Sequence, residues 1–465
     1  MFEVIQKHIK NNSSFIFLIF IIYFITYKNF NDHVWNKVRI IDQDIVSYYA
    51  YLPAIFIKKD IKLKFTDHTN AYVISCQYWP LKAPNGGKVI KTTMGLAILY
   101  SPFFGIAHLE AKLFHQKQDG FSYPYQKWIH FSGFFYFILG LIFLRKLLKY
   151  FFDDLSVGLT LFIIALCTNI LYYGSNMNAM PHVFDFCLLS IFLIYSIKWF
   201  ENKSYLNTLI LGVIGGMLLL IRPTNILFFL FPILIHICTF QDLKNRMRLF
   251  IKEWKKLVFF ILLVFIMILP QLLYWKYITN SYIFNSYIGE HFFWTKPHIL
   301  EGLFSYRKGW LVYTPMMIFS IVGFMVLFKK YKFLFWGVFL FFCINIYVIF
   351  CWWSWWYGGG YGMRSLIDSY PILALPLAAF ICFLVSLKRK IYILIFILVI
   401  FFGFTLNLKQ IKYYQLSVLH WDGMTKESFW RVFKEESLDS TYWKTIKPPD
   451  YDKAKKGIDE YDFKP

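Results

Sequence analysis

Charged residues are scarce in this chain. Only 16% of its 465 residues are Asp, Glu, Lys or Arg, whereas a soluble domain averages about 25%. Hydrophobic residues make up 58%, and they form repeated apolar runs of roughly 18 residues or more, which is long enough to cross a bilayer. These properties exclude a soluble globular protein and indicate an all-α, polytopic membrane protein.

Signatures of zinc and nucleic-acid binding are also missing. The 7 cysteines form no Cys-x-x-Cys pair and no spacing typical of zinc sites. The net charge is +22, but the basic residues cluster beside apolar segments, as topology signals and lipid headgroup contacts do. We therefore expect contact with membrane lipids and no nucleic-acid partner. Binding of an anionic lipid-linked phosphate is a second use of these cations.

No small-residue cleavage site follows the basic N-terminus and the first apolar run, so we expect an uncleaved first helix.

Hydropathy predicts about eleven membrane spans. They lie near residues 14–27, 128–148, 155–172, 183–200, 206–221, 226–240, 257–277, 310–328, 333–350, 366–387 and 391–406.

Lys and Arg residues distinguish the two predicted sides of the membrane. Alternate connections are short and basic, namely those near residues 145–149, 198–203, 244–256, 329–332 and 388–390. The positive-inside rule then gives a cytoplasmic N-terminus. We expect a transmembrane domain over residues 1–406, with an extracytoplasmic first loop of about residues 29–127, and a small, partly helical extracytoplasmic tail over residues 407–465.

The first loop is expected to contain helices at the membrane surface. Residues 46–57 include tyrosines that suit the headgroup level. Residues 91–114 are apolar but are interrupted by Pro102. If this second segment crossed the membrane, every later loop would change sides and the basic loops would lie outside. We therefore predict a juxtamembrane or re-entrant helix.

A carboxylate just beyond the first span is hard to explain as packing. Asp44 stands there, close to Tyr48 and Tyr49. Cations lie on the same predicted side, namely Lys91, Arg222, Arg307, Lys308 and Arg364, and so do His182, Glu290, His291, Trp356 and Tyr361. Structural roles are the alternative for several of these residues. Arg222 and Lys308 would be anchors that snorkel to the membrane surface, His182 would be a satisfied interfacial histidine, and the tyrosines would belong to an aromatic belt.

One carboxylate among several cations suits a particular reaction. A sugar carried on a lipid phosphate already has a good leaving group, so its transfer needs no second carboxyl, unlike glycoside hydrolysis. It needs a base for the acceptor's proton and cations for the departing phosphate. Asp44 fits the base, and the phosphate-binding candidates are Lys91, Arg222, Arg307 and Arg364.

These residues resemble the GT-C superfamily of integral membrane glycosyltransferases, which includes the protein O-mannosyltransferases and the lipid A aminoarabinose transferase. Members carry a catalytic Asp or Glu after the first span, to which the segment DIVSYYAYLPA around Asp44 is similar. A Lys-led segment follows in the family, and here it begins at Lys91, with Thr92 and Thr93 in place of the usual prolines. The segment WYGGGYGMRSLIDSYP is similar to a Gly-then-Arg segment in many bacterial members.

The resemblance implies a GT-C-like fold and an inverting transfer from a polyprenyl-phosphate-linked sugar to a glycan, lipid or protein acceptor. It also implies that Lys91 contacts the donor phosphate. Asp44 would be the base, with Asp42 as its competitor because only Gln43 separates them. Tyr48, Tyr49, His182, Glu290, His291, Trp356 and Tyr361 would line the substrate site.

Many members of the superfamily need no metal, and no acidic pair with metal-ligand spacing is visible here. Asp44, Glu290 and His291 could hold a divalent cation if the fold gathers them. The alternative function is a transporter or flippase of a lipid-linked or anionic glycan, which predicts charges buried within the spans. A non-catalytic scaffold of the envelope is the other rival, and it gives no reason for cations to converge on one carboxylate.

Overall fold

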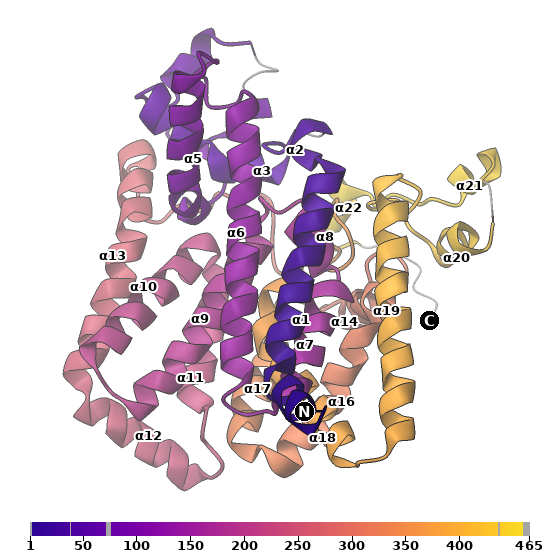
Figure 1. The fold of residues 1–465 in the computed structure, drawn as a ribbon. Helices are drawn as coiled ribbons and strands as arrows, with labels where there is room; N and C mark the ends of the chain where they lie inside the picture. Colours follow the sequence, from indigo (N-terminus) through magenta and orange to yellow (C-terminus); the bar gives the residue numbers. More distant parts are fainter. Residues whose placement is uncertain (1, 38, 71–75, 436–437, 459–465) are drawn as a thin grey trace.

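The computed structural model describes residues 2–37, 39–70, 76–435 and 438–458. These residues form a bundle of helices that run largely along one axis (Figure 1). The strands in the described part are β1 (Pro80–Lys82) and β2 (Lys88–Ile90), which pair antiparallel in a short hairpin. The all-helical class predicted from composition is thereby confirmed.

Seven helical segments of the described chain are long and apolar enough to cross a membrane, as a multi-pass protein requires. They are Asn12–Asn36 in α1 (Phe2–Asp32) and α2 (Val34–Lys37), α6 (Tyr123–Leu148), α9 (Pro181–Glu201), α13 (Trp254–Thr279), α17 (Lys332–Phe350), Arg364–Ser386 in η5 (Arg364–Ser369) and α18 (Tyr370–Ser386), and α19 (Lys390–Gln415).

The other four predicted spans correspond to shorter or interrupted helices, so the count of about eleven stays a prediction. Proline explains two of the interruptions, because it removes a backbone donor and restricts the residue before it. Pro223 and Pro315 each begin a 3₁₀ turn. The helices that correspond to these four predicted spans are α7 (Asp154–Leu166) with α8 (Ile170–Ser175), α10 (Tyr205–Ile221), η3 (Pro223–Phe229) with α11 (Leu230–Leu234), and α15 (Trp310–Tyr313) with η4 (Pro315–Met317) and α16 (Ile318–Lys330).

The helices pack in pairs that are distant in the sequence. The contacts join α1 to α7, α6 to α9, α10 to α13, and α16 to α18. Close to the N-terminal half of α1, the Asp154 carboxylate accepts hydrogen bonds from the backbone N–H and the hydroxyl of Ser14, both at 2.7 Å. Lys149 lies 2.9 Å from the same carboxylate. These polar contacts fix α1 against the start of α7.

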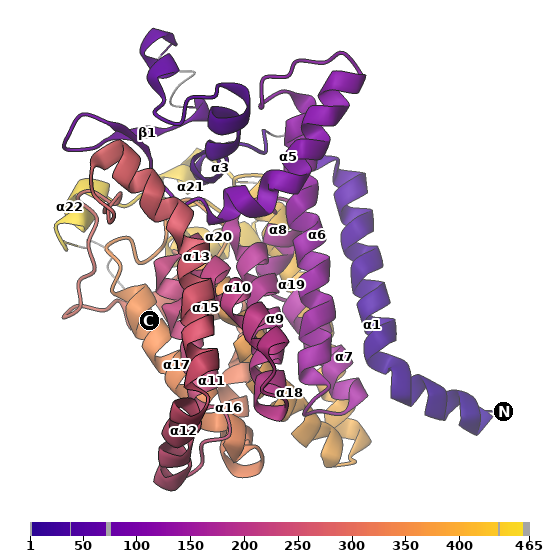
Figure 2. The same ribbon diagram turned by 90° about the vertical axis from the view of Figure 1, so that its left-hand side faces the viewer.

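Two ends of the bundle can be distinguished (Figure 2). One carries α3 (Asp44–Tyr49), η1 (Pro53–Ile57), η2 (Lys64–His68), the hairpin and α5 (Gly95–Leu113), which contains Pro102. We call it the α3 end. The amphipathic α12 (Phe240–Lys252) lies at the opposite end. There Arg246 donates to the backbone oxygens of Pro232 and Ile235, at 2.6 and 2.7 Å, and so satisfies carbonyls at the end of α11.

The last long helix continues beyond Leu406, where hydropathy ends the span, to Gln415. Asn407 and Gln410 face the bundle and are buried there. The Tyr361 hydroxyl lies 3.1 Å from Oδ1 of Asn407 and 2.9 Å from Oε1 of Gln410. In its described residues, the tail then forms the short helices α20 (Lys426–Lys434), α21 (Ser440–Lys444) and α22 (Tyr451–Lys455).

Candidate functional site

Asp44 begins α3 and faces a cation from the other half of the chain. Its Oδ2 lies 3.0 Å from Nη2 of Arg364, and the carboxylate side chain is 41% exposed. Gln43, directly before it, has a φ of 47°, a conformation that L residues rarely adopt and that occurs at functional sites. The structure thus brings together the predicted base and one predicted phosphate-binding cation.

The glycine-rich turn before Arg364 makes room for that side chain. A Cβ on Gly360 would lie 2.9 Å from the Tyr173 hydroxyl and 3.1 Å from Cδ of Arg364. Arg364 Nε donates to the backbone oxygen of Tyr357 at 3.0 Å. At this position, the missing side chain makes room for Arg364 itself.

A second ion pair at this site joins the Asp368 carboxylate to the Arg222 guanidinium. Arg222, at the end of α10, donates to Asp368 Oδ2, and His182 Nδ1 lies 2.7 Å from Asp368 Oδ1. His182 and Asp368 are buried. Tyr48 lies beside the Arg222 guanidinium, and burial raises the pKa of its hydroxyl. Arg222, His182 and Tyr48 therefore belong to the same polar network, close to Asp44.

One further carboxylate is fully buried next to this network. Asp185 Oδ1 accepts a hydrogen bond from Asn225 Nδ2 at 3.0 Å. Its Oδ2 has no hydrogen-bond partner among the described residues. A buried polar atom without a partner costs free energy, and active sites are one of the places where it occurs.

Lys91 is paired as well. Its Nζ lies 2.7 Å from Oε1 of Glu290, whose Oε2 accepts a hydrogen bond from Trp353 Nε1 at 3.1 Å. The ammonium lies over the Tyr287 ring, 5.1 Å from its centroid. Three cations at the α3 end are thus matched by three carboxylates: Arg364 by Asp44, Arg222 by Asp368, and Lys91 by Glu290.

Arg307 and Lys308 lie among the tryptophans of the same region. The Arg307 guanidinium is 5.2 Å from the Trp356 ring centroid and donates to the Lys447 backbone oxygen at 3.4 Å. The Lys308 ammonium donates to the backbone oxygen of Gly360. Arg307 therefore binds the tail and the tryptophans, and it makes no ion pair with Asp44.

The pKa of the Lys308 ammonium is lowered to about 7, mainly by burial; Asp422 opposes this shift, and Arg364 and Arg307 contribute to it. The pKa of an unfolded lysine is 10.5. Between these values the unfolded chain binds more protons than the folded one, so stability rises with pH. We expect the melting temperature of the wild type to rise between pH 7 and 9 relative to that of Lys308→Met. Scanning calorimetry in detergent measures this, and Lys412→Met, an exposed lysine, is the control. Parallel curves for all three proteins would contradict the expectation.

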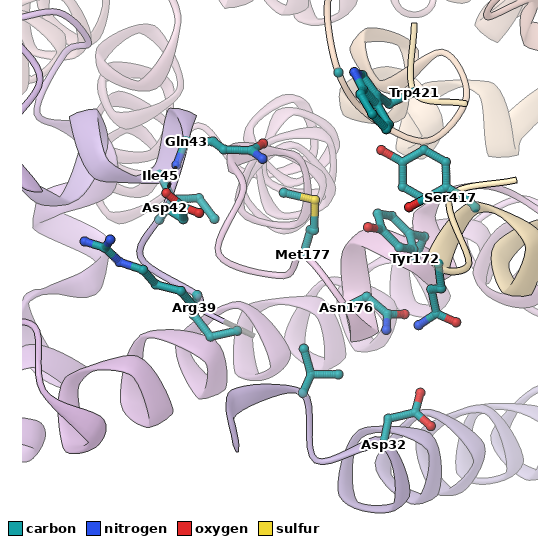
Figure 3. Close-up of a pocket in the computed structure, with 15 residues that line it drawn as sticks. Asp32, Arg39, Asp42, Gln43, Ile45, Tyr172, Asn176, Met177, Ser417 and Trp421 are labelled. Atoms are coloured by element: carbon teal, nitrogen blue, oxygen red, sulfur yellow. Dashed lines mark hydrogen bonds between the residues drawn. The ribbon is translucent and has the colours of Figure 1, made fainter. Parts of the chain in front are cut away.

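A cavity of about 630 Å³ lies at the start of α3 (Figure 3). Gln43 and Ile45, the neighbours of Asp44 in the sequence, line it, and so does Gly359. Asp42 also lines the cavity, and its Oδ1 accepts the Gln43 backbone N–H at 2.9 Å. The two rival carboxylates are thus separated: Asp42 faces the cavity and Asp44 faces Arg364.

Three predicted lining residues have other surroundings. The Tyr49 hydroxyl donates to the backbone oxygen of Gly120, inside an aromatic cluster of the first loop. Tyr361 is buried against α19. The His291 side chain is exposed, while its backbone oxygen accepts from Trp353 N at 3.0 Å. In the described residues no group of three His, Cys, Asp or Glu side chains could hold a metal ion, so Asp44, Glu290 and His291 do not form the divalent-cation site that was considered.

Sequence reasoning assigned no role to Asp368 or Asn225. The available signal for Asp368 was a carboxylate at the start of a predicted span, where charges are rare and functional. Asn225 gave no signal, because asparagine after a proline is ordinary in a loop. Its role depends on Asp185, which lies 40 residues away in the sequence.

No model of a known protein family matches the chain, and no curated protein matches it. The site itself therefore carries the functional proposal.

Proposed function

We propose that this protein is a membrane glycosyltransferase of the GT-C type. It transfers a sugar from a polyprenyl-phosphate carrier to an acceptor on the extracytoplasmic face of a bacterial inner membrane. The observation that carries the proposal is the Asp44–Arg364 pair. A partly exposed carboxylate is held by a guanidinium at 3.0 Å, at the end of a helical bundle where Arg222 and Lys91 also lie.

In the proposed reaction, Asp44 accepts the proton of an acceptor hydroxyl. The hydroxyl oxygen attacks the anomeric carbon from the face opposite the phosphate, so the configuration inverts. The bond between that carbon and the phosphate oxygen breaks, and the phosphate leaves with the electron pair. Cations stabilise the charge that develops on the leaving oxygen. No second carboxyl is needed because the phosphate requires no protonation to leave.

The cations retain donors for a phosphate although each is paired. Arg364 uses Nη2 for Asp44 and Nε for Tyr357, and Nη1 makes no hydrogen bond with the described residues. Arg222 uses Nη1 for Asp368. Guanidinium groups bind phosphate through several N–H groups at once. A phosphate can thus bind without breaking the ion pairs, which supports donor binding next to Asp44.

The proposed function is tested by the choice of donor. Purified protein in lipid nanodiscs is given either polyprenyl-phosphate-linked sugars or the corresponding nucleotide sugars, both radiolabelled, with envelope material from a deletion strain as acceptor. We expect label to move from the lipid-linked donor alone. Arg364→Ala is expected to raise the KM for the donor about tenfold or more. Equal transfer from nucleotide sugars would refute the proposal.

One observation favours the alternative of a transporter or flippase. Asp185, Asp368 and His182 are ionisable groups buried within apolar helices, as in transport pathways. They lie near the α3 end, since Asp368 contacts Arg222 and His182 begins α9. Proteoliposomes distinguish the two functions. A transporter would move a lipid-linked glycan across the bilayer without changing it covalently, and Asp44→Asn would move it equally fast.

A further inference from the structure

The cavity at the start of α3 differs in charge from the cluster of cations near Asp44. Arg364, Arg222 and Lys91 are absent from its lining. Its charged lining residues are Asp32, Asp42 and Arg39. Asp32 is paired with Lys28 at 2.7 Å, and Arg39 Nη2 donates to the backbone oxygen of Cys76 at 2.9 Å. With Asp32 paired, Arg39 and Asp42 leave the lining without a net charge, so the cavity has no excess of cations for an anionic ligand.

Polar groups without partners point into the cavity from its buried wall. Tyr172 and Asn176 are only 7% and 8% exposed, and both line the cavity. Asn176 Oδ1 accepts from Ser175 Oγ at 2.8 Å. Within the described chain, the Asn176 amide nitrogen and the Tyr172 hydroxyl make no hydrogen bond. Since both residues line the cavity, these two groups are available to a ligand that both donates and accepts hydrogen bonds.

An aromatic face completes the site. Trp421 lines the cavity and is 47% exposed, and its ring stacks on His420 with centroids 4.0 Å apart. Figure 3 shows Trp421 and Ser417 on the side opposite to Arg39, Asp42 and Gln43. One face of the Trp421 ring is covered by His420, and polar side chains lie among the other lining residues. Such an aromatic surface suits a ligand that is apolar on one side and polar at its edge. The volume of about 630 Å³ is typical of a small-molecule pocket.

We infer that this cavity binds the acceptor, and that the acceptor is a neutral, hydroxyl-rich saccharide. The inference rests on the proposed function, which it extends by naming the acceptor class. The cations then bind the donor phosphate. The cavity, whose lining includes both sequence neighbours of Asp44, holds the saccharide whose hydroxyl that carboxylate deprotonates. A lipid chain would leave Tyr172 and Asn176 unpaired, and an anionic glycan would find no excess of cations in the lining.

Binding is tested directly with the full-length protein in nanodiscs by saturation-transfer NMR. The probes are neutral di- and trisaccharides of hexoses and N-acetylhexosamines, hexuronic acid disaccharides, and a Ser/Thr-rich peptide. We expect the neutral saccharides to bind, and Trp421→Ala to weaken their binding about tenfold. Trp443→Ala is the matched control, because Trp443 is 50% exposed and lies in α21, outside the cavity. Binding of the peptide alone, or of none of the probes, overturns the inference, as does unchanged saccharide binding in Trp421→Ala.

The two proposals fail in different ways. Asp44→Asn is expected to bind the saccharide as tightly as the wild type, because binding does not require the base. If saccharides bind but no lipid-linked donor supports transfer, the proposed function fails and the cavity assignment stands. If transfer occurs and Trp421→Ala leaves the KM for the acceptor unchanged, the cavity assignment fails and the proposed function stands. Gln415→Ala, an exposed residue of the lining, provides a second variant that leaves the fold intact.

Discussion

Asp44→Asn is expected to lower turnover by at least about a hundredfold, which is the usual loss when a general base is removed. Asparagine keeps the shape of the side chain and can still accept a hydrogen bond from Arg364, whose Nη2 lies 3.0 Å from Asp44 Oδ2. The variant should therefore fold and bind the donor normally. Initial rates with a lipid-linked donor, together with the KM for that donor, measure the effect. Transfer at a near-normal rate would exclude Asp44 as the base.

Asp42→Asn is the matched control for this experiment. The Asp42 carboxylate lines the cavity, and an asparagine there can still accept the Gln43 backbone N–H through its side-chain oxygen. We expect this variant to retain most of its turnover and to change mainly the KM for the acceptor. The reverse result, with Asp42→Asn inactive and Asp44→Asn active, would transfer the role of base to Asp42.

Asp368→Asn is expected to destabilise the protein by about 3–5 kcal/mol, the usual cost of breaking a buried ion pair by removing one partner. The carboxylate is 5% exposed and binds both Arg222 and His182. Removal of its charge leaves the Arg222 guanidinium without compensation in a poorly hydrated region. A lower melting temperature in detergent, and unfolding at a lower denaturant concentration, measure this loss.

An exposed ion pair provides the comparison for Asp368. Asp67 and Lys88 lie 2.6 Å apart, with the Asp67 side chain 59% exposed, and such pairs contribute little to stability. Asp67→Asn should therefore leave the melting temperature nearly unchanged. The double variant Arg222→Met, Asp368→Leu should recover part of the lost stability, because apolar residues can replace a buried pair. Equal melting temperatures for Asp368→Asn and the wild type would show that the pair does not stabilise the fold.

Much of the helical architecture could be predicted from hydropathy and proline. The apolar runs mark the helices, and Pro223 and Pro315 mark two of the breaks. The break after α7 is different, because Cys167, Thr168 and Asn169 contain no helix-breaking residue. There, Asn407 Nδ2 donates to the backbone oxygens of Leu166 and Thr168, both at 2.8 Å. Those carbonyls are satisfied by a side chain that comes from α19, so the break cannot be read from the local sequence.

The sequence could predict which charged residues lie at the candidate site, but not which of them form ion pairs with one another. Topology placed Asp44, Lys91, Arg222 and Arg364 on one side, and all four lie at the α3 end. Topology specifies a side and not a neighbour, however. Lys91 and Glu290 are 199 residues apart in the sequence, and their pairing depends on how the first loop packs against the segment after α13. The roles of these residues in catalysis stay predictions.

Segments near both ends of the polypeptide line the cavity, together with Tyr172, Asn176, Met177 and Gly359 from between them. Asp42 and Gln43 form one side, and Ser417 and Trp421 form the other. During synthesis the first side is in place early, while the second leaves the ribosome only after α19. A growing chain can thus hold most of its helices in the membrane and still lack this compartment. The order of assembly itself would keep unfinished molecules from capturing an acceptor, and pulse-labelled chains stopped before α19 should fail to bind saccharide.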